Sequence, residues 1–105
     1  MALALELGEP GRVVELARAV DVTAMPSTGR QATFYGDLGR GLATIRGREE
    51  QAVEAFRRAE TLAPYRTRTN PFVREAVTEL MRRARREAGG RELRGIAYRM
   101  GLGVG

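Results

Sequence analysis

Cysteine and histidine are both absent from the 105 residues of this chain. Without cysteine there is no thiolate nucleophile and no disulfide, and without histidine the usual general base near neutral pH is missing. The commonest zinc ligands are lacking for the same reason. Magnesium sites and carboxylate mechanisms remain open, because the chain has 13 acidic residues, but these would have to converge in a pocket. We therefore expect no enzyme activity, no bound metal and no cofactor.

Lysine is absent too, so all 18 basic residues are arginine and the formal net charge is +5. One interpretation is an acidic partner or nucleic acid, since a basic surface attracts both. The other is a genome rich in G and C, whose codons favour arginine over lysine on a solvated surface. The second is favoured, because the charge is spread along the chain and aromatic residues do not alternate with it.

Long apolar runs are missing as well. No stretch approaches the roughly 18 consecutive apolar residues of a membrane-spanning helix. The apolar segment Met1–Leu7 is too short for a secretory signal and lacks a basic leader. We expect a cytoplasmic protein that does not contact a membrane.

Aromatic residues make up only 6% of the chain and tryptophan is absent, whereas alanine, leucine and valine are frequent. This composition suits close-packed helices better than a sheet sandwich. Apolar residues recur at steps of three and four, the spacing of one helix face. The pattern predicts helices over residues 12–20, 29–46, 48–63, 70–88 and 91–100, with Met1–Leu7 as the end of a helix.

Turn and capping residues mark several of the predicted helix ends. Thr28 lies three residues before Gln31, the spacing at which two side chains cap a helix start reciprocally. Asn70 followed by Pro71 predicts another start, because asparagine accepts from free amides and proline has the backbone angle of a first turn. The stretch Tyr65–Thr69, after Pro64, is predicted to be a polar loop.

Each predicted helix has one apolar face, which we expect to be buried. These faces consist of Val13, Leu16, Ala17 and Val20; Tyr35, Leu38, Leu42 and Ile45; Ala52, Ala55, Phe56, Ala59 and Leu62; Val73, Val77, Leu80, Ala84 and Ala88; and Leu93, Ile96, Ala97 and Met100. The second helix also contains Gly36, Gly39 and Gly41, each costing about 1 kcal/mol relative to alanine. Glycine at these positions predicts the close approach of a neighbouring helix.

One internal repeat is visible between residues 38 and 64. It consists of Leu38-Gly39, Leu42, Gly47, Ala52, Phe56, Ala59 and Pro64. This pattern resembles a tetratricopeptide repeat, in which small residues permit two antiparallel helices to cross closely and an aromatic residue fills the space between hairpins. A step back of about 39 residues reaches Gly8, Val13, Ala17 and Val20, a degenerate second copy.

The resemblance implies an all-α fold built of antiparallel helical hairpins, a tetratricopeptide-like α-solenoid with a C-terminal capping helix. The expected organisation is one domain over residues 1–100, followed by a flexible tail at 101–105. Within it, residues 1–20 form the degenerate repeat, 28–64 the best repeat and 70–100 the capping helices. A helical bundle of another kind is the alternative.

The C-terminal part carries a second resemblance. The run from Asn70 to Glu75, the run from Leu80 to Arg86 and the run from Gly89 to Gly95 are similar to the ending of a group of actinobacterial transcriptional regulators. In that group, a helix-turn-helix of the Xre type precedes tetratricopeptide-like repeats. The resemblance implies the C-terminal regulatory and dimerisation part of such a regulator, reaching DNA only through a helix-turn-helix that this chain lacks. A stand-alone adaptor for a protein partner is the alternative.

Self-association is a related expectation. A repeat array that begins inside a helix exposes an apolar side that would otherwise stack on a neighbour, and a closed two-fold dimer would cover it.

In tetratricopeptide proteins the first helix of each hairpin lines the partner-binding groove. Carried onto this chain, that face holds Thr33, Gly36, Arg40 and Thr44 on the best repeat and Glu75, Thr78 and Glu79 on the later helix. The resemblance implies that a peptide or an acidic segment of a protein partner binds there. The alternative is that these side chains are merely exposed.

The densest basic cluster is Arg82, Arg83, Arg85 and Arg86, followed by Arg91, Arg94 and Arg99. One hypothesis is a patch that contacts nucleic-acid phosphates, with binding that falls steeply with salt. The other is pairing along the helix, from Glu79 to Arg83 and from Arg83 to Glu87. The best acid pairs are Glu49 with Glu50 and Glu75 with Glu79, the latter one helical turn apart. A pair on one helix face could hold a magnesium ion, but no phosphate-binding glycine loop accompanies either pair.

Overall fold

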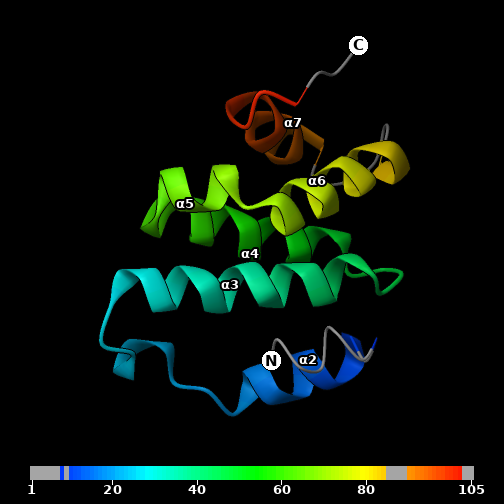
Figure 1. Ribbon diagram of the computed structural model, residues 1–105. Coiled ribbons are helices and arrows are strands. Elements are labelled where there is room, and N and C mark those ends of the chain that lie inside the picture. Colours follow the sequence, from blue (N-terminus) through cyan, green and yellow to red (C-terminus); the bar gives the residue numbers. More distant parts are fainter. Residues whose placement is uncertain (1–7, 9, 85–89, 103–105) are drawn as a thin grey trace.

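All regular structure within residues 8, 10–84 and 90–102, the part of the chain that the computed structural model describes, is helical. The elements are α2 (Pro10–Arg18), the short 3-10 helix η1 (Val22–Ala24), α3 (Thr28–Ala43), α4 (Glu49–Leu62), α5 (Pro64–Thr69), α6 (Pro71–Ala84) and α7 (Gly90–Arg99). They are stacked in layers, with α2 at one end, α7 at the other and α3 and α4 between them (Figure 1). In the described ranges, no helix has both the length and the apolar character needed to cross a bilayer.

The residue that caps the start of α3 lies one position before the predicted cap. Ser27, not Thr28, caps the helix, and its Oγ accepts a hydrogen bond from the Arg30 amide at 3.1 Å. Gln31 does not complete the reciprocal pair, because its Nε2 donates to the carbonyl of Met25 at 3.4 Å. Serine and threonine can both cap a helix, so the backbone decides which of them does: Ser27 has the extended conformation of a cap residue, and the helix begins after it.

Helices α3 and α4 form an antiparallel hairpin. Gly47 lies in the turn with φ of +87°, a left-handed conformation that glycine adopts without strain. The Arg58 guanidinium donates to the Tyr35 hydroxyl at 3.4 Å, and Phe56 lies against Gly39. A later residue of α3 thus contacts an earlier residue of α4, which is the pattern of two antiparallel helices. The glycine prediction is confirmed here, because a β-carbon on Gly39 would stand 2.6 Å from the Phe56 ring.

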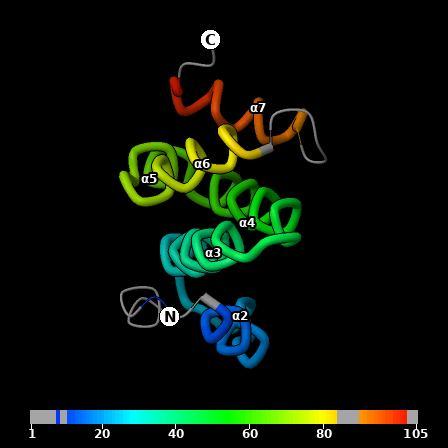
Figure 2. Tube along the Cα trace, turned by 90° about the vertical axis from the view of Figure 1, so that its right-hand side faces the viewer, coloured from blue at the N-terminus to red at the C-terminus, as the bar shows by residue number. Residues whose placement is uncertain are grey.

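The buried side of α3 is wider than the predicted stripe. Of Tyr35, Leu38, Leu42 and Ile45, only Leu42 is fully buried. The other buried residues of α3 are Ala32, Phe34, Gly36, Gly39, Gly41 and Ala43. This part of the prediction was wrong because α3 lies in the middle of the stack and packs against α2, α4 and α6 on different sides (Figure 2).

The segment predicted as a polar loop is the short helix α5. Pro64 occupies its first turn, so the proline begins a helix as well as following one. Thr67 is buried, and its hydroxyl donates to the carbonyl of Ala59 at 2.9 Å. A polar residue thus serves as an interior contact of α5 with α4, which apolar periodicity cannot reveal.

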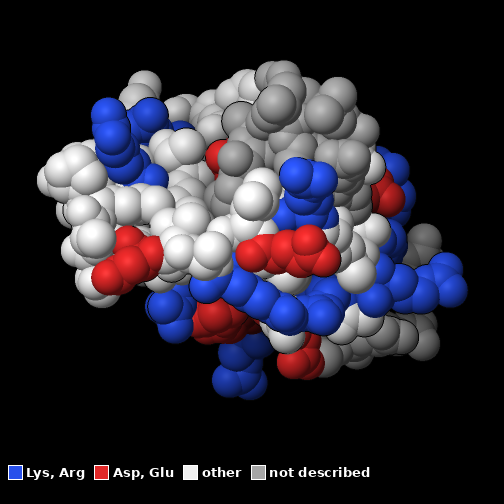
Figure 3. Space-filling model, turned by 90° about the horizontal axis from the view of Figure 1, so that it is seen from below, with Lys and Arg blue, Asp and Glu red and all other residues white. Residues whose placement is uncertain are grey.

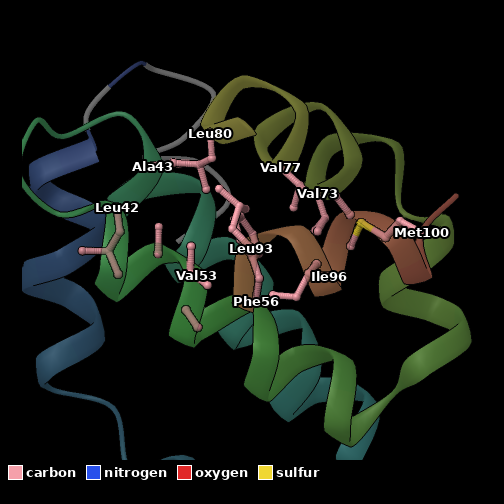
Figure 4. Close-up of a cluster of buried hydrophobic side chains, with 13 residues drawn as sticks. Leu42, Ala43, Val53, Phe56, Val73, Val77, Leu80, Leu93, Ile96 and Met100 are labelled. Carbon is pink, nitrogen blue, oxygen red and sulfur yellow. The ribbon is translucent and has the colours of Figure 1, made fainter. Parts of the chain in front are cut away.

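Asn70 and Pro71 start α6 as predicted. The Asn70 Oδ1 accepts from the amides of Phe72 at 2.9 Å and Val73 at 3.2 Å. This start fixes the phase of α6 and points Val73, Val77 and Leu80 into the core that α6 shares with α3, α4 and α7 (Figure 4). The Ala84 side chain and Ala88, also predicted for this seam, lie outside what the structure describes.

The core joins α3, α4, α6 and α7. Its largest fully buried side chains include Phe56, Leu80, Leu93 and Ile96, which come from three of these helices. The predicted apolar face of α7 is confirmed, since Leu93, Ile96, Ala97 and Met100 are all buried.

A buried carboxylate ties α7 to the hairpin. Glu60 of α4 is 6% exposed and pairs with Arg99 at 2.7 Å and with Arg68 at 2.9 Å. Burial raises the pKa of Glu60, but the hydrogen bonds from Arg99 and Arg68 outweigh it and hold that pKa below its ordinary value. Arg99, predicted as part of a basic run, therefore pairs with Glu60 and stabilises the contact between α7 and α4.

The end of the chain departs from the prediction of a tail that frays after Met100. Gly101 has φ of +71°, its amide donates to the carbonyl of Tyr98 at 3.0 Å, and the Leu102 amide donates to Ala97 at 2.9 Å. This pattern closes α7 by capping its last carbonyls. The rest of the predicted tail, and the helix end predicted for Met1–Leu7, fall outside the described residues.

The outermost helix α2 buries little of its predicted face. Val13 is fully buried, whereas Leu16 is 41% exposed and Val20 is 37% exposed. One turn of α2 therefore anchors the helix to the stack.

Candidate functional site

Four of the predicted groove residues line one hollow between α3 and α6. Its volume is about 270 Å³. We call it the α3–α6 groove, and its described lining residues are Arg40, Ala43, Thr44, Phe72, Glu75, Ala76 and Glu79. By volume, the groove can hold one or two side chains of a partner.

Helical spacing brings these side chains to one place. Arg40 and Thr44 are four residues apart on α3, and Glu75 and Glu79 are four apart on α6, so each pair lies on one face of its helix. The two faces meet because α3 and α6 pack side by side. The two helices are near each other at Gly36 and Val73, because a β-carbon added to Gly36 would lie 3.6 Å from a methyl group of Val73.

An arginine stacked on an aromatic ring forms one wall of the groove. The Arg40 guanidinium lies 4.8 Å from the centre of the Phe72 ring, a cation–π geometry. Asp37 lies 3.8 Å from Arg40 on the preceding turn. Burial raises the pKa of Asp37 more than the charge of Arg40 lowers it. The neighbouring Asp37 and the Phe72 ring together hold the Arg40 guanidinium in place, and Phe72 remains 57% exposed.

Carboxylates line the α6 side of the groove, next to Phe72. Glu75 and Glu79 both line the groove and are exposed, and Glu79 pairs with Arg82 at 2.9 Å. Two of the three charged groups on the described lining are thus negative. An acidic segment, one of the occupants implied by the sequence resemblance, would be repelled here, whereas a basic side chain would be attracted.

The remaining predicted groove residues lie elsewhere. Thr33 lines a separate hollow of about 30 Å³ beside α5, and its hydroxyl donates to the Gly29 carbonyl at 3.0 Å. Thr78 is exposed on α6 outside the described lining, and its hydroxyl donates to the Arg74 carbonyl at 2.8 Å. Gly36, also placed on this face, is buried. Thr33 precedes Arg40 by seven residues, about two helical turns, and so lies about 10 Å farther along α3, whereas Thr78 and Glu79 are adjacent residues that point in different directions from α6.

Phe72 is the most exposed of the groove residues that the sequence reasoning missed, the others being Ala43 and Ala76. It precedes Glu75 by three residues and Glu79 by seven, so helical spacing alone places it on the same face. An exposed aromatic residue on that face was the signal that could have revealed it.

Two arginines of the predicted basic cluster have structural contacts. Arg82 pairs with Glu79, so the expected pairing of Glu79 with Arg83 was wrong by one residue. Arg83 instead donates to the carbonyl of Ala43, at the C-terminal end of α3. Arg85, Arg86 and the expected partner Glu87 lie outside the described residues.

The described ranges contain no group of three or more side chains that could hold a metal ion. Glu75 and Glu79 therefore form at most a pair there. The chain matches none of the protein-family models, curated proteins or solved structures with which it was compared.

Proposed function

We propose that this chain is a non-catalytic, tetratricopeptide-like interaction domain whose α3–α6 groove binds a short segment of a protein partner. The observation that carries the proposal is the meeting of Arg40, Thr44, Glu75 and Glu79 in one hollow. The sequence pattern alone predicts that these four residues share a groove face. The antiparallel hairpin with Phe56 packed on Gly39 supports the same assignment, because it supplies the close helix crossing that such repeats require.

The lining of the groove defines the chemistry of the segment. Phe72, Ala43 and Ala76 offer apolar surface for one apolar side chain, and Glu75 and Glu79 attract a basic one. We therefore expect a segment that carries an arginine or lysine close to an apolar residue.

The biological setting we propose is the regulatory and dimerisation part of a bacterial transcriptional regulator. Support comes from the resemblance of the segment after Asn70 to the ends of such regulators. In this proposal DNA is bound by a separate helix-turn-helix, and a bound segment changes the pairing of two regulator copies. The exposed Leu16 of α2, and Val20 just after that helix, supply apolar surface for that pairing.

A peptide library displayed on phage tests the groove. Enriched sequences are resynthesised with a fluorescein label, and binding to the purified chain is measured by fluorescence anisotropy. We expect enrichment of a basic residue next to an apolar one, and a loss of affinity of about tenfold or more in the Glu75→Arg variant.

Two matched variants control for charge and position. Glu15→Arg makes the same change in net charge on the exposed surface of α2, and Thr78→Arg adds a positive charge to α6 outside the groove. Both should bind as the parent does. Equal losses in Glu75→Arg and Glu15→Arg, or the absence of any enriched sequence sensitive to Glu75→Arg, would contradict the proposal.

A further inference from the structure

A second, larger depression lies on the opposite side of α3. It consists of two hollows of about 660 Å³ and 340 Å³ that share the lining residues Val22, Tyr35 and Arg58 and are therefore adjacent. We call the combined depression the α2–α4 trough. Its first part lies between α2, α3 and α4, and its second part continues beside η1 toward the end of α4.

The floor of the trough is apolar. It is formed by Phe34, Leu38 and Leu42 of α3 and Ala55 of α4, with Val14 and Ala17 of α2 as one wall. Along α3 the lining extends from Gln31 to Leu42, which at about 1.5 Å per residue is a length of roughly 16 Å. An α-helix of about three turns has that length, and its apolar face fits such a floor. A nucleic-acid backbone would instead need cationic groups along the floor.

The rim of the trough is predominantly basic. Its described charged residues are four arginines and two glutamates, namely Arg18, Arg48, Arg57, Arg58, Glu50 and Glu54. Figure 3 views the molecule from the α2 side and shows arginines in a band across that face, interrupted by carboxylates. This rim has the opposite sign to the α3–α6 groove, where carboxylates are in the majority.

Several rim arginines are held in place. Glu54 is shared by Arg57 at 2.6 Å and Arg58 at 3.7 Å, so one carboxylate faces two guanidinium groups. The Arg58 guanidinium also lies 5.6 Å from the centre of the Tyr35 ring, and Arg48 donates to the Gln51 side chain at 2.9 Å. Arg57 and Arg58 still expose 40% and 55% of their side chains. Arginines fixed in this way lose little conformational entropy when they pair with a partner.

From the apolar floor, the length and the basic rim, we propose that the α2–α4 trough binds an amphipathic helix of a protein partner. The apolar face of that helix packs on the partly exposed Val14, Ala17 and Leu38, above the buried Phe34 and Leu42, and its acidic flanks pair with the rim arginines. Charge complementarity selects this occupant over a basic helix. The inference does not depend on the α3–α6 groove being occupied, because the trough shares no lining residue with it.

The test uses two fluorescein-labelled model peptides of about three to four helical turns. Both carry leucines at three- and four-residue spacing. One has glutamates on both flanks of the leucine stripe, and the other has lysines at the same positions. Anisotropy titrations at low and moderate salt should show the glutamate peptide binding at least about tenfold more tightly than the lysine peptide, with an affinity that decreases as salt increases.

Variants locate the binding surface. Arg48→Glu and Arg58→Glu should each weaken binding of the glutamate peptide about tenfold, whereas Arg91→Glu makes the same charge change on α7 and should have little effect. Ala17→Phe fills the trough without changing charge and should also weaken binding. Circular dichroism of each variant establishes that the helices are retained.

Three outcomes would overturn the proposal. The first is equal binding of the two peptides, and the second is equal loss in Arg58→Glu and Arg91→Glu. The third is a dimer in sedimentation equilibrium that Arg58→Glu converts to monomer without any peptide binding by the parent, since a second copy would then be the occupant.

Discussion

Two glycines of α3 offer a matched test of the packing between the helices of the hairpin. Gly36 and Gly39 both lie in the interior of α3, so replacing either with alanine improves helix propensity by about 1 kcal/mol. Their surroundings differ. A β-carbon on Gly36 would meet its nearest neighbour, a methyl group of Val73, at 3.6 Å, which is ordinary van der Waals contact. A β-carbon on Gly39 would lie 2.6, 2.7 and 3.0 Å from three atoms of the Phe56 ring.

The ring of Phe56 has no room to move away, because the residue is 0% exposed and surrounded by the core. Overpacking a well-packed core costs about 1–3 kcal/mol. For Gly39→Ala this cost exceeds the gain in propensity, so we expect a net loss of up to about 2 kcal/mol in the free energy of unfolding. For Gly36→Ala only the gain remains, so we expect stabilisation of up to about 1 kcal/mol. Each kcal/mol corresponds to a shift in Tm of about 4–8 °C for a domain of this size.

Urea unfolding followed by far-ultraviolet circular dichroism measures both variants. Because the propensity terms cancel in the comparison, the difference between the two variants reports the contact with Phe56 alone. A second measurement places Gly39→Ala in a Phe56→Leu background, where the smaller side chain should reduce the cost of the alanine. The reasoning would be refuted if the two alanine variants changed stability in the same direction, or if Phe56→Leu left the cost of Gly39→Ala unchanged.

Three further predictions concern the ion pairs and caps. Glu60→Gln leaves Arg68 and Arg99 without their carboxylate, and we expect it to lower the free energy of unfolding by about 1–3 kcal/mol, as measured by urea unfolding near neutral pH. The loss should be smaller than for a fully buried ion pair, because both arginines are partly exposed. In the folded chain the pKa of Glu60 lies below its ordinary value, so the stabilisation by its carboxylate is complete above the ordinary pKa and is lost as pH falls through the folded pKa. The difference in unfolding free energy between the parent and Glu60→Gln should therefore shrink over that acidic pH range. A difference that stays constant there would contradict the assignment. Asn70→Ala removes the acceptor for the amides of Phe72 and Val73 and should lower the free energy of unfolding by about 1 kcal/mol, whereas Asn70→Ser should retain most of it.

The two surfaces of α3 have complementary roles in these proposals. The α3–α6 groove is small and lined mainly by carboxylates among its charged groups, whereas the α2–α4 trough is long, apolar and rimmed by arginines. The net charge of +5 alone does not indicate where on the surface a charged partner would bind. Its distribution over the fold instead separates a site for a basic segment from a site for an acidic one.

The sequence alone determined the helical character and most helix positions, because apolar periodicity, Asn70 and Gly47 act over a few residues. It also indicated the close approach at Gly39, since glycine in a helix interior lowers stability unless a neighbour uses the space. Four of the seven residues predicted for the groove face line one hollow for a similar reason: residues four apart along a helix share a face whatever surrounds them.

Only the tertiary structure decided which sides of α3 are buried and which charged groups meet. Periodicity predicts one buried face, but α3 lies between three helices and buries small residues on several sides, which left Tyr35 and Leu38 beside an open trough. Arg99 and Arg83 belong to a basic run in the sequence, yet one pairs with Glu60 and the other with a backbone carbonyl of α3, at separations of 39 and 40 residues. Such partners are set by how the helices stack, and local sequence carries no record of that arrangement.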